Sequence, residues 1–241
     1  MIKNDEKTRK KISNNVVETP KDLSIYIYKK LYRKSFKNIL DIGCFKGNLS
    51  TPFSKIKNTK IIGIDVINDY KDKFDFFIYK DFLDTTKEDY KDLNIDLILC
   101  NPPFHSCNKT QKLYPMLFLE HIFKIFGKNI PLVFIVPSYF IYNSKKRMKI
   151  LEQYNITHNI NLHKTVFNES GVTVECNVLF FNIKQKKSES FYISQQQKKQ
   201  RTFYTIALNK KQSKFIEDLN INNFNKFIKE LIKSKYDDFE I

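Results

Sequence analysis

The chain has 241 residues, of which 41% are hydrophobic and 28% are charged, and its formal net charge is +16. This length fits one domain with at most a small appendage and is enough to bury a hydrophobic core, which argues against a disordered or fibrous protein. The positive charge is almost entirely lysine, and such a field attracts phosphate groups, so it favours a nucleic-acid partner.

The four cysteines form no Cys-x-x-Cys pair and no Cys/His cluster at metal-ligand spacing, which argues against a disulfide framework and against a zinc site. No run approaches the roughly 20 apolar residues of a membrane-spanning helix, and the chain does not open with the apolar core of a signal peptide. We therefore expect no metal, no membrane partner and a soluble protein in a reducing, cytoplasmic compartment.

Short apolar runs alternate with amphipathic segments along most of the chain. After a polar stretch at 1–15, residues 23–31 have their apolar side chains at helical spacing. The runs that predict strands are 38–42, 60–64, 76–79, 95–100, 132–136 and 172–181, and helical periodicity recurs at 113–126 and 145–154. This alternation predicts the α/β class, with βαβ units in an open, doubly wound, mainly parallel sheet covered by helices on both faces.

The alternation stops after residue 183. Residues 184–201 are basic and contain a Gln-Gln-Gln run, and apolar side chains return at helical spacing beyond residue 215. We therefore divide the chain into a mobile basic N-terminus at 1–15, a domain at 16–183, and a basic linker with a C-terminal helical extension at 184–241.

Two of the predicted strands end in residues suited to a nucleotide-like ligand. Asp41, Gly43 and Gly47 lie where the first strand runs into a tight turn that opens a helix, and glycine there permits close approach of a ligand. Asp65 ends the second strand, where a carboxylate can accept both hydroxyls of a ribose. Together the two motifs favour an adenosine-containing ligand.

The strongest motif is the tetrapeptide Asn101-Pro102-Pro103-Phe104, directly after the strand at 95–100. Two consecutive prolines remove two amide donors and stiffen the turn. The Asn101 amide oxygen and the Pro102 carbonyl can each accept a hydrogen bond from a planar NH2 group, while Phe104 stacks on the ring that bears it. Such a clamp directs the nitrogen lone pair toward an electrophile and catalyses by positioning.

With these motifs the sequence resembles the class I S-adenosylmethionine-dependent methyltransferases, and within them the N6-adenine DNA methyltransferases that carry an Asn-Pro-Pro-Phe motif. The resemblance covers about 19–182 and implies a Rossmann-like, seven-stranded sheet, with 16–183 as the catalytic domain. It also implies S-adenosylmethionine as the cofactor.

The resemblance assigns roles to individual residues. Asn101, Pro102, Pro103 and Phe104 would be catalytic, Asp65 would hold the ribose, and Asp81 and Phe82 would bind the cofactor adenine. The full set of implied cofactor-binding residues is Thr19, Pro20, Asp41, Gly43, Cys44, Gly47, Asp65, Val66, Asp81, Phe82 and Asn101. One departure is Phe45, which stands where the family loop has its middle glycine.

The resemblance implies a nucleic-acid partner, with DNA favoured over RNA, and an adenine that is turned out of the duplex before methylation. The alternatives are an RNA adenine-N6 methyltransferase, a protein glutamine methyltransferase, and an inactive methyltransferase-like subunit that binds nucleic acid, which Phe45 favours. The short stretch after residue 182 predicts relaxed target specificity or a partner chain that supplies it. Arg147 and its neighbouring lysines either contact phosphates or solvate a helix face, and His105 and His121 are expected at solvated positions.

Overall fold

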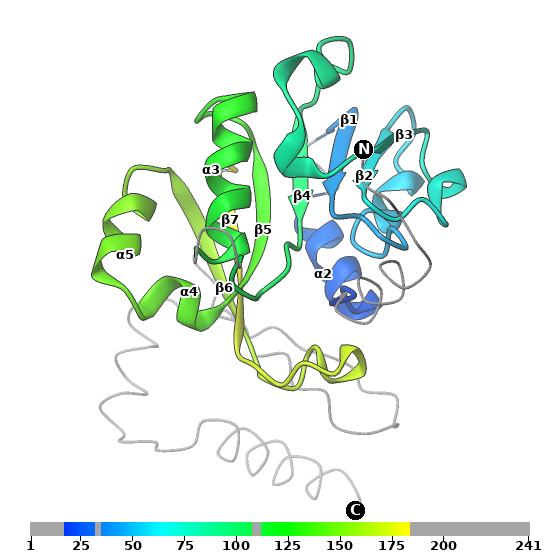
Figure 1. Ribbon diagram of the computed structural model, residues 1–241. Coiled ribbons are helices and arrows are strands. Elements are labelled where there is room, and N and C mark those ends of the chain that lie inside the picture. The colour runs from blue at the N-terminus through cyan, green and yellow to red at the C-terminus, as the bar shows by residue number, and fades with distance from the viewer. Residues whose placement is uncertain (1–16, 32–34, 108–111, 184–241) are drawn as a thin grey trace, which may run out of the picture. The chain divides into compact units, whose positions relative to one another are not determined.

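The computed structural model describes residues 17–31, 35–107 and 112–183, which form a seven-stranded sheet with helices on both faces (Figure 1). The strands are β1 (Asn38–Ile42), β2 (Lys60–Asp65), β3 (Phe76–Tyr79), β4 (Leu97–Cys100), β5 (Leu132–Pro137), β6 (Ile156–Leu162) and β7 (Cys176–Phe181). The α-helices are α2 (Lys21–Leu31), α3 (Tyr114–Phe126), α4 (Ser138–Tyr142) and α5 (Lys145–Leu151). Short 3₁₀ helices are η2 (Thr51–Lys55), η3 (Lys71–Lys73), η4 (Phe82–Asp84), η5 (Lys87–Tyr90) and η6 (Asn168–Ser170).

The strand order is β3-β2-β1-β4-β5-β7-β6. Strands β1 to β5 pair in parallel, and β7 runs antiparallel to β5 and β6. The chain moves outward from β1 to β3 and then returns to place β4 on the other side of β1. Ligands of open α/β sheets bind beyond the carboxyl ends of the strands at such a switch point. The predicted α/β class and mainly parallel, seven-stranded sheet are confirmed.

Alternate residues of the central strands enter two separate cores. In β1, Ile39 packs into a core with α2, whereas Leu40 packs into a second core with α3. The buried residues of α2 lie at helical spacing, and those of α3 form a wider apolar face, so each helix covers one side of the sheet. This two-sided burial explains why the strands are continuous apolar runs rather than alternating ones.

The turn after β1 leads into the 3₁₀ helix η2 and not into an α-helix, which corrects the expectation for this segment. The local sequence accounts for the difference. The Thr51 hydroxyl donates to the Gly47 carbonyl at 2.6 Å, and Pro52 lies at the start of η2 with no backbone N–H to donate. Side-chain hydrogen bonds of this kind compete with the α-helical pattern.

The predicted N-terminal segment 1–15 and the predicted extension at 184–241 lie outside the described residues. Among the helices of the described ranges, none has the length and apolar character needed to cross a membrane.

Gly63 in β2 allows two side chains to lie directly over the strand. A Cβ at this position would stand 2.8 Å from Cγ and Cδ1 of Phe74 and 3.0 Å from Sγ of Cys44. These distances are shorter than carbon contacts permit, so only glycine fits without displacement. The close packing brings the turn after β1 against β2, which is the wall of the site described below.

We predict that Gly63→Ala destabilises the protein by about 1–3 kcal/mol, because the added methyl group overpacks the contact with Phe74 and Cys44. Thermal denaturation of the full chain measures the effect as a lower Tm. Lys60→Ala, at the exposed first residue of the same strand, is the control and should change the Tm little. A Tm for Gly63→Ala equal to that of the control would show that Phe74 moves away at no cost.

Candidate active site

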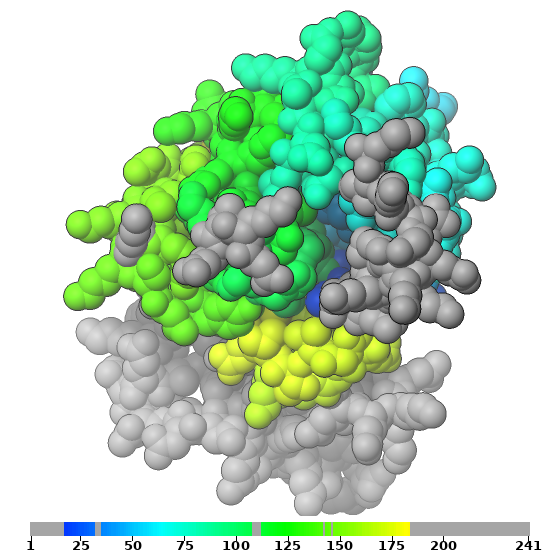
Figure 2. Space-filling model, in the orientation of Figure 1, coloured from blue at the N-terminus to red at the C-terminus, as the bar shows by residue number. Residues whose placement is uncertain are grey.

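A cavity of about 420 Å³ lies at the carboxyl ends of the central strands, within the usual volume range of small-molecule sites. Its walls come from the ends of β1 to β4 and from the segment that precedes α2. In Figure 2 a few blue atoms from the early part of the chain are visible beside the green part of the chain. The position is the switch point that the strand order defines.

Most of the predicted site residues line this cavity. They are Thr19, Asp41, Gly43, Cys44, Asp65, Val66, Asp81, Phe82, Asn101, Pro102 and Pro103. Pro20 and Gly47 do not line it. The Pro20 carbonyl accepts hydrogen bonds from the backbone N–H and hydroxyl of Ser24 at the start of α2, and Gly47 shapes the turn after β1 with a φ of +72°.

The Asn101 side chain is held in one orientation by the segment before α2. Its Nδ2 donates to the backbone carbonyl of Val17 at 2.9 Å and to Oγ1 of Thr19 at 3.1 Å. A carbonyl oxygen only accepts, so the nitrogen of the amide must face Val17 and the oxygen must face away. That oxygen, Oδ1, is buried, and it has no hydrogen-bond partner among the described residues. The site therefore contains an acceptor without its donor, which costs about 1–3 kcal/mol.

Phe104, the last residue of the tetrapeptide, is packed away from the cavity. Its side chain is 7% exposed, and its ring meets the buried ring of Phe167 edge-on, with centroids 5.9 Å apart. The Tyr139 hydroxyl donates to the Phe104 carbonyl at 2.7 Å. In this structure Pro102 and Pro103 form the cavity wall, and stacking of Phe104 on a target ring stays a prediction.

The turn after β1 forms an open cradle. The backbone N–H groups of Gly43 and Cys44 both donate to the carbonyl of Ile64, which ties the turn to β2. Gly43 has a φ of +67°, which favours glycine. A Cβ on it would point into free space, with the backbone oxygen of Asn101 as the nearest atom at 4.0 Å. The absent side chain leaves that space for a ligand.

Phe45 adopts the backbone conformation that a glycine would take at the same position, with a φ of +41°. This conformation costs a residue with a Cβ about 1–2 kcal/mol. The backbone N–H of Phe45 donates to Oδ2 of Asp65 at 2.8 Å, and its ring meets that of Tyr70 edge-on with centroids 5.2 Å apart. Phe45 lines the cavity together with the predicted residues, so the substitution keeps the site open.

Two carboxylates at successive strand ends face the cavity with acceptor capacity left over. Asp65 accepts from the backbone N–H groups of Phe45 at 2.8 Å and Ile67 at 2.9 Å. Burial raises the pKa of Asp65, and these hydrogen bonds oppose the increase. Asp81 accepts from the backbone N–H of Leu83 at 3.0 Å through Oδ1. A carboxylate has about four lone-pair sites, so both groups can accept further hydrogen bonds from hydroxyl or amine donors.

Asp41 is a third carboxyl group in the cavity wall and is almost completely buried. Its Oδ2 accepts from the Ser50 hydroxyl at 2.6 Å. Burial raises the pKa of Asp41 to about 7, because the charged form loses its hydration, and the hydrogen bond from Ser50 opposes this only in part. Between about pH 4 and pH 7 the folded protein therefore holds a proton on Asp41 that the unfolded chain releases.

We predict that the free energy of unfolding decreases as the pH rises, because the folded protein must give up the proton on Asp41. A raised carboxyl pKa contributes stability below the unfolded value, and that contribution is lost as the pH passes through the folded value near 7. The Asp41→Asn variant cannot ionise at this position. Urea unfolding from pH 5 to pH 8 should therefore show that the free energy of unfolding of the variant, minus that of the wild type, increases by up to about 1.4 kcal/mol per pH unit. Parallel profiles for the two proteins would contradict the assignment.

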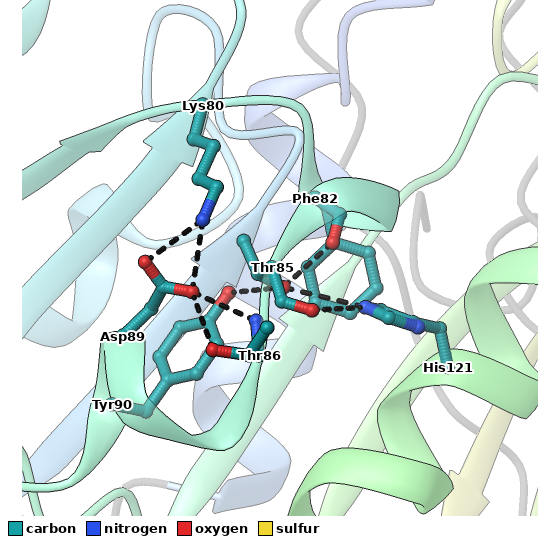
Figure 3. Close-up of polar contacts among 7 residues, drawn as sticks. All are labelled: Lys80, Phe82, Thr85, Thr86, Asp89, Tyr90 and His121. Atoms are coloured by element: carbon teal, nitrogen blue, oxygen red, sulfur yellow. Dashed lines mark hydrogen bonds and ion pairs between the residues drawn. The ribbon is translucent and has the colours of Figure 1, made fainter.

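The segment that carries Asp81 and Phe82 is braced by a set of hydrogen bonds (Figure 3). The Thr85 hydroxyl donates to the Phe82 carbonyl at 2.6 Å and accepts from the Tyr90 hydroxyl at 3.2 Å. His121 of α3 lies with Nε2 3.1 Å from the Thr85 carbonyl, so Nε2 carries the proton, and burial lowers the pKa of this histidine. Nearby, Lys80 contacts both carboxylate oxygens of Asp89 at 3.0 Å.

We predict that Thr85→Val destabilises the protein by about 1–3 kcal/mol, because the Phe82 carbonyl and the Tyr90 hydroxyl lose their shared partner. Thr85→Ser keeps the hydroxyl and is the matched control, with a smaller effect. Urea denaturation midpoints of both variants and the wild type measure the difference. Equal midpoints for Val and Ser at this position would show that the hydroxyl does not brace the segment.

Several cavity residues carried no sequence signal. Glu18, Lys46, Lys80, His105, Tyr114 and Phe118 line the cavity, and they belong to no motif that the sequence analysis used. His105 is exposed, as expected, and it also lines the cavity, with its ring edge-on to that of Tyr114. Arg147 donates to the backbone carbonyls of Tyr139 and Phe140 at 2.9 Å, so its guanidinium already holds α4.

Within the described ranges, no group of three or more His, Cys, Asp or Glu side chains is placed to hold a metal ion.

In sequence, no family model and no curated protein matches this chain. Solved structures do match its fold. A protein from Vibrio vulnificus YJ016, assigned as the modification subunit of a type I restriction enzyme, is 18% identical with a TM-score of 0.56; the match covers 86% of this chain and 52% of that one. A protein from Listeria monocytogenes, assigned to the class I S-adenosylmethionine-dependent methyltransferases, is 16% identical with a TM-score of 0.56 and coverages of 76% and 67%.

A third match is DrdV, solved in complex with DNA, which is 13% identical with a TM-score of 0.53 and coverages of 75% and 27%. This chain therefore spans about half the length of the Vibrio subunit and less of DrdV. Taken with the strand order and the antiparallel β7, these matches show that the chain has the Rossmann-like fold of the class I S-adenosylmethionine-dependent methyltransferases.

Proposed function

We propose that this protein transfers a methyl group from S-adenosylmethionine to the exocyclic N6 amine of adenine in DNA, with residues 16–183 as its catalytic domain. The observation that carries the proposal is the buried, unpartnered Oδ1 of Asn101, a residue that lines the cavity. The amide is fixed by Val17 and Thr19, so the oxygen is presented to a donor that the protein itself does not provide. An amine with two N–H groups is such a donor.

The cavity residues fit the proposed cofactor. Asp65 can accept the ribose hydroxyls, and the Asp81 carboxylate and Phe82 ring suit an adenine. The open cradle at Gly43 leaves room for the part of the cofactor between the ribose and its amino-acid end. When bound, S-adenosylmethionine supplies a methyl group on a positively charged sulfur. The Listeria protein of the same fold is assigned as dependent on this cofactor, which supports the proposal.

The tetrapeptide after β4 would position the target amine. Asn101 Oδ1 and the Pro102 carbonyl each accept one N–H, which leaves the nitrogen lone pair directed toward the methyl group. Oδ1 is covered in this structure, so binding of the amine requires that the atoms covering Oδ1 be displaced. An amine nitrogen held in this way needs no strong base before methyl transfer, and the contribution of such positioning is several kcal/mol.

DNA is the substrate that the charge and the fold matches favour. A formal net charge of +16 attracts a phosphate backbone, and DrdV, which shares the fold, was solved bound to DNA. The Vibrio protein is assigned to a restriction enzyme, which also favours DNA. An adenine in structured RNA presents the same amine, so RNA is the second candidate substrate.

We predict that Asn101→Ala lowers methyl-transfer turnover by about 100-fold or more, because the target amine loses its fixed acceptor. The affinity for S-adenosylhomocysteine should fall far less. Ser170→Ala is a control, because it removes a different hydrogen bond to the same segment, from the Ser170 hydroxyl to the Glu18 carbonyl. Equal losses of turnover and ligand affinity in Asn101→Ala would make Asn101 a structural residue.

Nucleoside mass spectrometry tests the substrate. The wild type and Asn101→Ala are expressed in a host that lacks DNA adenine methylation, and N6-methyladenine is measured in DNA and RNA. An increase in DNA with the wild type alone is the expected result. An increase of N6-methyladenine only in RNA would identify RNA as the substrate. No increase in either nucleic acid would favour a protein glutamine methyltransferase or an inactive subunit.

A further inference from the structure

The Asn-Pro-Pro-Phe tetrapeptide after β4 is held at both of its ends. At its first residue, the side chain of Asn101 is bound to the segment before α2. At its last residue, the Tyr139 hydroxyl donates to the backbone carbonyl of Phe104, and the two oxygens are 2.7 Å apart. The two prolines between these ends have no N–H group to donate, so the orientation of the tetrapeptide depends on such contacts from other segments.

Tyr139 is itself fixed from two sides. It is the second residue of α4, which follows β5 directly (Figure 1). The hydroxyl of Ser138, the residue before it, donates to Oδ1 of Asn177 in β7 at 2.7 Å. Arg147 of α5 donates to the backbone carbonyl of Tyr139 at 2.9 Å. Burial raises the pKa of Tyr139, so its hydroxyl keeps the proton that it donates to the tetrapeptide.

The two prolines make the tetrapeptide stiff. Each proline ring fixes its own φ near about −65°, so the middle of the tetrapeptide turns little independently of its ends. The Pro102 carbonyl, which is the second acceptor in the proposed function, lies between the two ends that Asn101 and Tyr139 hold. A displacement of about 1 Å in the reacting geometry can lower a rate about 100-fold. The contact at Phe104 therefore affects how the target amine is presented.

We propose that Tyr139 is a positioning residue for methyl transfer, because its hydroxyl fixes the last residue of the tetrapeptide and thereby the direction of the Pro102 carbonyl. The inference rests on the proposed function, which supplies the reaction. Tyr139 is not among the described residues that line the cavity, so it acts through the tetrapeptide and not by contact with the cofactor. The Phe104 ring packs on Phe167 without the hydroxyl, so removing the hydroxyl leaves the tetrapeptide in place but less firmly oriented.

The first test is Tyr139→Phe, which removes the hydroxyl and keeps the ring. Methyl transfer from labelled S-adenosylmethionine is measured on DNA and on RNA from a host that lacks DNA adenine methylation. Turnover should fall about tenfold, the effect of one lost hydrogen bond, while the Kd for S-adenosylhomocysteine should not change. Tyr154→Phe is the control, because it removes a hydroxyl from a tyrosine whose ring stacks on Phe123 of α3, with centroids 4.3 Å apart.

A double variant distinguishes positioning from general support of the fold. If Tyr139 acts through the tetrapeptide, Tyr139→Phe should lower turnover by a smaller factor in the Asn101→Ala background than in the wild type, because two residues that act on one segment are coupled. Equal factors in both backgrounds would overturn the assignment. So would unchanged turnover in Tyr139→Phe, or a Kd for S-adenosylhomocysteine that rises as much as turnover falls.

The outcomes also separate this inference from the proposed function. A wild type that methylates neither DNA nor RNA would overturn the proposed function, and the role of Tyr139 would fall with it. A wild type that methylates DNA, with a loss of turnover in Tyr139→Phe that is absent from Tyr154→Phe and smaller in the Asn101→Ala background, supports both.

Discussion

The site depends on one interaction, the pair of hydrogen bonds from the Asn101 amide nitrogen to Val17 and Thr19. These bonds join the end of β4 to a segment more than 80 residues earlier in the sequence. They fix which way the amide points, and they leave its oxygen buried without a donor. A fold tolerates an unsatisfied acceptor of this kind where a ligand completes it, and Asn101 lies in the wall of the cavity where a ligand would bind.

The sheet brings the other groups of the site to the same place. Because β1 to β4 are parallel and adjacent, their carboxyl ends lie along one edge, where the order is Asp81 after β3, Asp65 at the end of β2, the turn after β1, and Asn101 after β4. Because Gly63 has no Cβ, the side chains of Cys44 and Phe74 can pack directly over β2. Phe45 shows that the turn after β1 tolerates a large side chain when its backbone N–H binds Asp65 and its ring contacts Tyr70.

Features that depend on neighbouring residues were predictable from sequence, and features that depend on distant partners were not. Apolar runs marked six of the seven strands, and glycine, aspartate and the Asn-Pro-Pro-Phe tetrapeptide marked several of their ends. Strand β6 was not predicted, because its polar and apolar residues alternate and form no apolar run. The contact of Glu18 with Lys46 joins residues 28 positions apart, and that of Thr85 with His121 spans 36, so no local pattern signals either. The burial of Phe104 likewise depends on its contact with the distant Phe167. The 3₁₀ form of η2 depends on the hydrogen bond from the Thr51 hydroxyl to the Gly47 carbonyl, and the sequence alone does not show which partner a hydroxyl will bind.

A crystal structure of the protein with S-adenosylhomocysteine and adenosine tests the central claim most directly. The account predicts that the exocyclic amine of the adenosine lies within hydrogen-bond distance of Asn101 Oδ1, with the amide nitrogen still bound to Val17 and Thr19. An adenosine bound elsewhere, or an Asn101 amide whose oxygen stays without a donor while both ligands are present, would contradict it.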